Sequence, residues 1–131
     1  MPNFLHTADG EKIAYEMSAG AGPTLIWCGG LKSDMDGSKA THLHRWAEAR
    51  GQGFIRFDYF GHGISSGEFT DGTMSRWASD IEVVMNELSA DPIILVGSSM
   101  GGWAALLAAI ENKKRIVGLV LINPAPNFSE K

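Results

Sequence analysis

The apolar residues of this chain fall into two kinds of pattern. Continuous apolar runs are typical of strands covered on both faces, and they predict strands at 24–28, 54–59, 93–96 and 116–122. Two shorter segments at the N-terminus, 3–7 and 12–17, are joined by Asp9-Gly10, a dipeptide that favours a hairpin turn. The chain therefore opens with an antiparallel hairpin and continues with buried strands.

The segments between the buried strands have the three- and four-residue spacing of helices. We predict a helix over 38–50, with Ser38 as its cap and Gly51 as its stop, a second over 73–90 capped by Thr73, and a third over 100–112. The second has one apolar face, formed by Met74, Trp77, Ile81, Val84, Met85 and Leu88. Strands that alternate with helices predict an α/β fold of three layers, α/β/α, with a mostly parallel sheet.

Composition narrows the class of protein further. The 131 residues are 44% hydrophobic and 20% charged, and no internal boundary divides them, so residues 1–131 are read as part of one domain. A net charge of −4 argues against nucleic acid as a partner, because phosphate binding needs a basic face. No apolar run is long enough to span a membrane, and no secretory or transit-type leader is visible. We therefore expect a cytoplasmic protein.

Cysteine usage agrees with a reducing compartment. Cys28 is the single cysteine, which excludes a disulfide within the chain. Because it ends an apolar run, we expect a buried and inert thiol.

The strongest chemical signal is the G-x-S-x-G motif at residues 97–101. It lies between the apolar run 93–96 and a small-residue segment, which is the strand, turn and helix context that gives the motif meaning. Gly97 and Gly101 would let the strand and the helix approach closely, so that Ser99 is held at a sharp turn. We interpret Ser99 as the nucleophile of a serine hydrolase. The alternative is a glycine-rich turn with an idle serine.

The order of these parts resembles the N-terminal half of an α/β-hydrolase, over essentially the whole chain. Residues 58–65 resemble the D-x-x-G-x-G-x-S turn of that superfamily, and Asn123-Pro124-Ala125 resembles the end of its sixth strand. Within the superfamily, three blocks are similar to the mitochondrial acyl-glucuronide esterase and palmitoyl-protein thioesterase group and its bacterial relatives: 30–40, 55–59 and 97–103. The resemblance implies an α/β-hydrolase fold that is incomplete here, without its C-terminal strands and lid.

Acyl transfer needs two N–H donors that face the developing oxyanion. The motif places one donor on Met100, the residue after the nucleophile, and the other on the loop after the third strand, which by position is Leu31. Leu31 follows Gly29-Gly30, whereas family members commonly have a His-Gly pair there. The alternative is that these glycines form only a flexible loop. Asp34 and Asp36, close by, are expected to cap the helix that follows; the alternative is that either of them orients the loop.

The remaining machinery of a serine hydrolase is not visible in the sequence. The family order is Ser, then an acid, then His, but after Ser99 the chain has no His and no Asp, and Glu111 and Glu130 are its only later acids. In the strand order that the resemblance implies, His62 follows a strand two places from that of Ser99, about 10 Å away, too far for a direct hydrogen bond unless a loop folds over. His42 and His44 are expected on a helix surface.

The sequence therefore predicts a serine hydrolase that cleaves carboxylic esters or thioesters through an acyl-enzyme on Ser99. Its partner would be a small acyl substrate, with no metal, no organic cofactor, no nucleic acid and no membrane. The apolar strand 116–122 would form a sheet edge that a complementary C-terminal half, or a second copy, could cover. The rival from another class is a non-catalytic interaction module or inactive fragment that retains the hydrolase scaffold. A dehalogenase or epoxide hydrolase is disfavoured, since those relatives have Asp at the elbow.

Overall fold

A computed structural model describes residues 3–122, so the expectations for 123–126 and for the tail lie outside the described residues. Six strands form one sheet in the order β1-β2-β4-β3-β5-β6. β1 and β2 are antiparallel to their neighbours, and the other four strands run parallel. The strands are β1 Asn3–His6, β2 Lys12–Ser18, β3 Ala21–Cys28, β4 Gln52–Phe57, β5 Ile93–Ser98 and β6 Ile116–Ile122.

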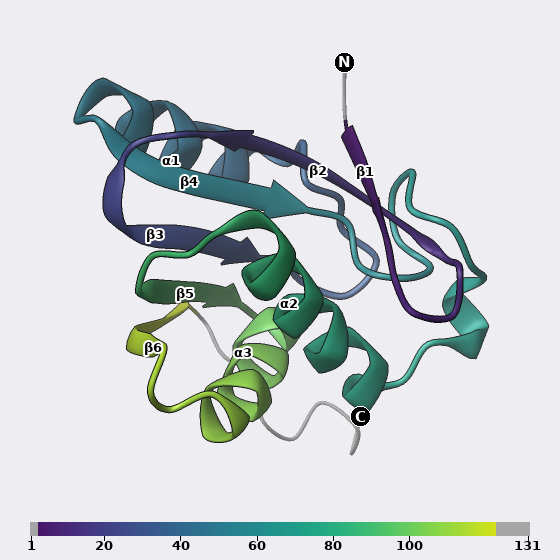
Figure 1. Cartoon of the computed structure of the whole chain (residues 1–131). Coiled ribbons are helices and arrows are strands. Elements are labelled where there is room, and N and C mark those ends of the chain that lie inside the picture. Colours follow the sequence, from purple (N-terminus) through teal and green to yellow (C-terminus); the bar gives the residue numbers. More distant parts are fainter. Residues whose placement is uncertain (1–2, 123–131) are drawn as a thin grey trace.

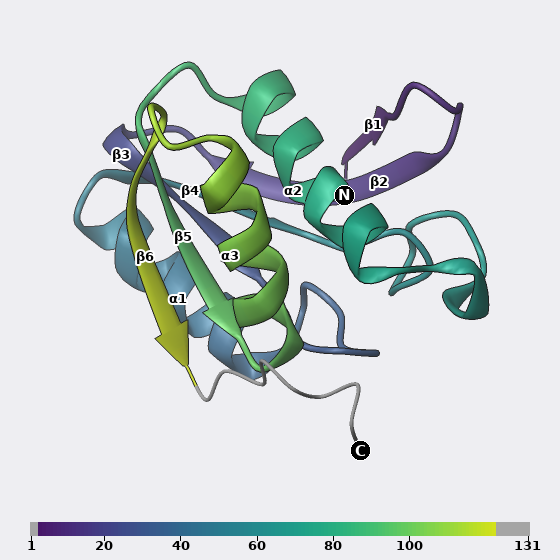
Figure 2. The ribbon, with the colours of Figure 1, turned by 90° about the horizontal axis from the view of Figure 1, so that it is seen from below.

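The helices lie on both faces of the sheet (Figures 1 and 2). One face is covered by α1, and the other by α2 and α3, while a short 3₁₀ turn, η1, lies in the loop before α2. Their bounds are α1 Ser38–Ala49, η1 Phe69–Asp71, α2 Met74–Leu88 and α3 Met100–Glu111. This confirms the predicted α/β/α architecture with a mostly parallel sheet.

The continuous apolar runs are explained by two separate cores. Along β3, Leu25 and Trp27 pack with α1 on one face, while Ile26 and Cys28 pack under α2 and α3 on the other. Successive side chains of a strand point to opposite faces, so a strand buried on both sides must be apolar at every position. The predicted face of α2 is confirmed, because its six apolar residues all belong to or contact the larger core.

Several local expectations differ from the structure, among them the strand predicted at 54–59, which is β4 at Gln52–Phe57. β3 begins at Ala21 rather than Thr24, because the Ala21 N–H bonds to the Gly51 carbonyl and the register with β4 shifts beyond it. Ser38 is the first residue of α1 and not its cap, a position that Gly37 takes without a side-chain hydrogen bond. His44 is buried and stacks on Phe54, with 4.7 Å between ring centroids, so its expected surface position is wrong.

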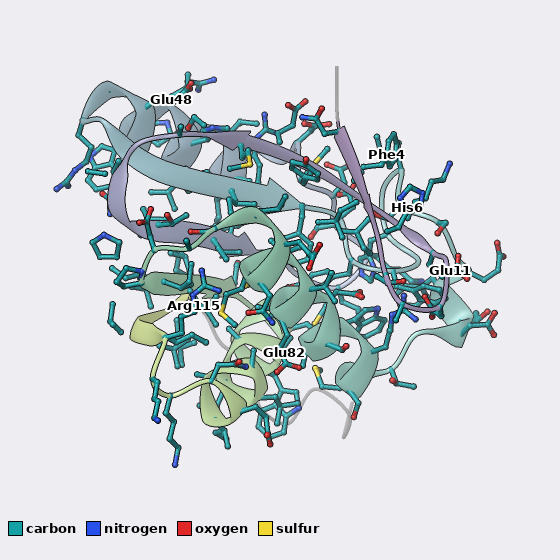
Figure 3. The ribbon with its side chains drawn as sticks, viewed as in Figure 1. Phe4, His6, Glu11, Glu48, Glu82 and Arg115 are labelled. Atoms are coloured by element: carbon teal, nitrogen blue, oxygen red, sulfur yellow. The ribbon has the colours of Figure 1, made fainter. Side chains whose placement is uncertain are left out.

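Polar side chains join the helices to the strands at the end of the sheet opposite the elbow. The Arg115 guanidinium, just before β6, donates to the carbonyls of Met85 and Asp91 and so ties the end of α2 to the start of β5 (Figure 3). Asn112 donates to Glu82 across 2.8 Å and joins α3 to α2. These contacts fix the spacing of the two helices that flank β5.

The outer strand β6 pairs only with β5 among the described residues. Val117, Val120 and Leu121 are exposed there, so the apolar edge that the sequence predicts is present. Its coverage by another polypeptide stays a prediction. Within residues 3–122, no helix is both long enough and apolar enough to cross a membrane.

A buried carboxylate joins α2 to the loop that follows β4. Asp80, which is 1% exposed, accepts from the Phe60 N–H at 2.8 Å and from Arg76 Nε at 3.1 Å. Burial raises the pKa of Asp80 to about 6, against the opposing effect of these two donors. The folded protein therefore binds this proton more tightly than the unfolded chain does.

This shift predicts a pH dependence of stability. The contribution of Asp80 to the free energy of unfolding is fully present below about pH 4, which is the pKa of this carboxyl in the unfolded chain. The contribution is lost as the pH rises through the folded pKa of about 6. Relative to Asp80→Asn, which does not titrate, the wild type should lose up to about 1.4 kcal/mol per pH unit across this window. Urea unfolding of both proteins at several pH values measures the difference. Stability curves that stay parallel would contradict the assignment.

Candidate active site

Ser99 occupies the turn between β5 and α3. Its backbone has φ 57° and ψ −120°, a region that non-glycine residues rarely adopt, at a cost of about 1–3 kcal/mol. The turn is held by the Ser99 N–H, which donates to the Ile122 carbonyl of β6, and by the Ser99 carbonyl, which accepts from Gly102, both at 3.0 Å. Ser99 is exposed, so this strained turn presents the serine side chain to solvent at the end of β5.

The glycines on either side of Ser99 allow backbone segments to touch. A Cβ on Gly97 would lie 2.6 Å from the Gly101 carbonyl oxygen, inside the start of α3. A Cβ on Gly101 would lie 2.5 Å from the Gly29 carbonyl oxygen and closer still to that of Cys28. The start of α3 therefore packs directly on the end of β3, as close as two backbones can approach.

The loop after β3, residues 29–37, lies beside the elbow. A Cβ on Gly30 would be in ordinary contact, 3.6 Å, with Cβ of Ser99. Residues 30–33 form a turn closed by the Ser33 N–H, which donates to the Gly30 carbonyl at 3.2 Å. Lys32 has φ 60°, the positive value that a type II turn needs at its third residue. Its ammonium lies 4.9 Å from the Phe69 ring centroid, which ties the turn to η1.

Two backbone N–H groups at this end of the sheet, just after β3 and β5, are available to a ligand. Within the described part of the chain, neither the Leu31 N–H nor the Met100 N–H donates a hydrogen bond. Met100 is the first residue of α3, where the helix dipole favours negative charge. Leu31 is exposed, at 41% of its accessible surface, while the Met100 side chain is buried. The arrangement can stabilise an oxyanion formed on a substrate beside Ser99.

Buried polar groups anchor the far end of the loop. The Asp58 carboxylate accepts from the Met35 N–H at 2.7 Å and from the Ile64 N–H at 3.0 Å, so it joins the loops that follow β3 and β4. Burial raises the pKa of Asp58, while these two N–H donors oppose the rise. Arg56 donates to the Met35 carbonyl at 2.9 Å and pairs with Asp36 at 2.7 Å. The Met35 peptide groups are thus held from both sides.

The expected capping role of the two loop aspartates is wrong. No side chain caps α1. Asp34 instead accepts from the Asp36 N–H within the loop, and Asp36 pairs with Arg56.

No described histidine hydrogen-bonds to Ser99. His62, 3% exposed, lies among the rings of Tyr59, Phe69 and Trp77, and its Nδ1 donates to the Phe60 carbonyl. Its Nε2 has no partner among residues 3–122, and burial lowers its pKa. The strand order places β4 two positions from β5, as the resemblance to the α/β-hydrolases implies.

The other histidines have structural contacts or lie on the surface. Arg56 Nε donates to His44 Nδ1 at 2.9 Å, so His44 Nε2 carries the proton toward the Ser18 hydroxyl at 3.0 Å. Burial and the Arg56 charge lower the pKa of His44. His42 and His6 are exposed.

A cavity of about 270 Å³ opens beside the elbow. It extends from Gly30 and Ser98 toward the start of α1, past Trp27 and Lys39. The described residues contain no cluster of three or more His, Cys, Asp or Glu side chains with metal-binding geometry. Cys28 is buried, and its burial raises the pKa of the thiol, as expected for an inert cysteine.

These features agree with a comparison to protein families. Residues 23–131 match the family described as the alpha/beta hydrolase fold, so the chain belongs to the α/β-hydrolases. More narrowly, it is similar to the mouse palmitoyl-protein thioesterase ABHD10, mitochondrial, with 36% identity over 94% of this chain and 41% of the mouse protein.

Solved structures agree with this placement. The structure of mouse alpha/beta hydrolase domain-containing protein 10 matches 92% of this chain and 48% of its own, with a TM-score of 0.89 and 35% identity. A hydrolase structure from Agrobacterium vitis S4 matches all of this chain and 55% of its own, with a TM-score of 0.90 and 43% identity. The chain thus spans about half the length of the solved relatives, and less of the curated ones.

The comparison corrects one expectation. The sequence predicted a cytoplasmic protein, but the curated relatives from mouse, cattle and human are all named as mitochondrial. The cytoplasmic assignment is therefore wrong. The absence of a recognisable leader was not sufficient ground for it.

The structure adds three residues that the sequence analysis did not identify. Arg56 and Tyr59 lie in or just after an apolar strand, and a charged or hydroxyl group in a buried strand is a usable signal. The Tyr59 hydroxyl donates to the Gly29 carbonyl at 3.0 Å. Ser33 donates through Oγ to the Gly30 carbonyl at 2.6 Å, and this turn carries little sequence signal because Lys32 is not glycine.

The close approach at Gly101 predicts a specific cost. Gly101→Ala should lower the free energy of unfolding by about 1–3 kcal/mol or more, because the added Cβ meets backbone oxygens of Cys28 and Gly29. Gly118→Ala on β6 is the control, since the atoms that its Cβ meets first are side-chain atoms of Ile94, the nearest at 3.1 Å, and not backbone. Urea unfolding measures both. Equal effects would show that the elbow tolerates a wider separation from β3.

Proposed function

We propose that this protein is a serine hydrolase that cleaves carboxylic esters or thioesters through an acyl-enzyme on Ser99. The observation that carries the proposal is the exposed serine at positive φ, placed beside two backbone N–H groups without partners in the described chain. A strained strand-to-helix turn of this kind exposes a nucleophile. Membership of a hydrolase family supports the same conclusion.

The chemistry has two halves. The Ser99 oxygen attacks the acyl carbon, its proton passes to a base, and the carbonyl becomes an oxyanion that accepts hydrogen bonds from the Leu31 and Met100 N–H groups. The leaving alcohol or thiol departs with a proton, and water then releases the acid by the same route. Gly97 and Gly101 serve by keeping the turn tight. The proposal assigns no base, because no described histidine contacts Ser99.

The relatives and the cavity support the proposed substrate class. A thioesterase is named among the similar proteins, and thioesters and oxygen esters form the same acyl-enzyme on serine. The cavity lined by Gly30 and Ser98 leaves room for one arm of a small acyl substrate near the turn that carries Ser99. No metal or organic cofactor enters this reaction.

Labelling with a fluorophosphonate tests the nucleophile. The protein should become labelled and should hydrolyse p-nitrophenyl esters and acyl thioesters. Ser99→Ala should abolish labelling and lower kcat by at least about a thousandfold, because the attacking oxygen is gone. Ser79→Ala, which removes an exposed serine of α2, is the matched control and should behave as wild type.

Two other outcomes discriminate the alternatives. Hydrolysis that persists in Ser99→Ala would contradict the proposal directly. Neither labelling nor turnover, even when a complementary C-terminal half is supplied, would favour the rival function, a non-catalytic module built on the hydrolase scaffold.

A further inference from the structure

We infer that Ser33 is a positioning residue of the oxyanion site: its hydroxyl holds the Gly30–Leu31 peptide so that the Leu31 N–H faces the place where the oxyanion forms. The inference rests on the proposed function, since it concerns how one of the two donors is aimed. It assigns a role to a side chain that lies outside the elbow motif.

The orientation of the Gly30–Leu31 peptide unit is determined by the hydrogen bonds of its carbonyl. The Gly30 carbonyl and the Leu31 N–H belong to the same planar group and, in a trans peptide, point in opposite directions. Ser33 binds that carbonyl twice, through Oγ at 2.6 Å and through its N–H at 3.2 Å. A carbonyl held on the Ser33 side directs the Leu31 N–H away from Ser33.

The turn that carries Ser99 lies next to this peptide unit. Gly30 is the point at which the loop approaches the elbow, with its Cβ position 3.6 Å from both the Ser99 Cβ and the Ser98 carbonyl oxygen. The same position is 3.9 Å from Ser33 Oγ. The peptide unit is therefore confined between the Ser33 hydroxyl and the elbow.

The Gly30–Leu31 peptide unit needs a restraint against rotation. Gly29 and Gly30 lack side chains, so the chain can rotate about their backbone bonds more freely than any other pair. Rotation of the Gly30–Leu31 plane would present a carbonyl to the oxyanion in place of an N–H. The preceding peptide has its own restraint, the Tyr59 hydroxyl on the Gly29 carbonyl at 3.0 Å. Ser33 supplies the corresponding restraint one residue later.

The expected effect is moderate, because the Ser33 N–H still holds the carbonyl when the hydroxyl is removed. A single hydrogen bond of this kind corresponds to about three- to tenfold in a rate constant. An interaction that matters only when charge develops should lower kcat and leave KM unchanged.

The test compares three variants of the protein in ester hydrolysis. Ser33→Ala should lower kcat by about three- to tenfold at constant KM, and Ser33→Thr, which keeps the hydroxyl, should restore it. Thr41→Val is the matched control, because it removes a hydroxyl that donates to a carbonyl of the same region, Gly37 at 3.1 Å, away from the elbow. It should leave kcat unchanged.

A second measurement distinguishes a misoriented Leu31 N–H from a general loss of stability. Phenylboronic acid forms a tetrahedral anionic adduct with an active serine, so its inhibition constant should rise in Ser33→Ala by the same factor by which kcat falls. An unchanged kcat and inhibition constant would overturn the inference, and so would a loss that Ser33→Thr does not restore. Ser99→Ala in the same assay distinguishes this failure from that of the proposed function: residual hydrolysis there contradicts the nucleophile itself.

Discussion

The candidate site depends on one contact between two backbones. The start of α3 lies against the end of β3 so closely that Gly101 has no room for a side chain beside the carbonyls of Cys28 and Gly29. β3 and β5 are parallel neighbours, so the loop after β3 and the turn after β5 lie at the same end of the sheet, and this contact holds them close together. Leu31 and Met100, far apart in sequence, then offer their N–H groups to the same space beside Ser99.

The rest of the fold holds these two loops in place at the end of the sheet. Two cores, one on each face, fix β3 between β4 and β5, and each buried aliphatic side chain contributes about 1.5–3 kcal/mol. Polar groups then fix the loops that the cores do not reach, chiefly Asp58, which joins two loops, and Arg56 on the Met35 carbonyl. Such fully bonded buried groups specify one arrangement of the loop rather than several.

Most of the fold could be predicted from the sequence because its signals are local. The apolar runs gave the strands, Thr73 was correctly placed as the cap of α2, and Asp9-Gly10 gave the hairpin turn. The elbow could be located from its motif, although its chemical role is still a proposal. His44 was misplaced because its burial depends on Arg56 and Ser18, partners that come from other strands.

The partners of the residues that support the loop could not be predicted for the same reason. Ser33, Arg56 and Tyr59 act on peptide groups whose orientation is decided by the tertiary packing. Nor could Asp36 be assigned its partner, since a cap and an ion pair leave the same trace in a sequence.

The most direct measurement is a crystal structure of the protein after reaction with a phosphonate that becomes covalently attached to a serine. We expect phosphorus on Ser99 Oγ and a phosphoryl oxygen within about 2.7–3.1 Å of the backbone nitrogens of both Leu31 and Met100. A phosphoryl oxygen that points into solvent, or an adduct on any other residue, would contradict it.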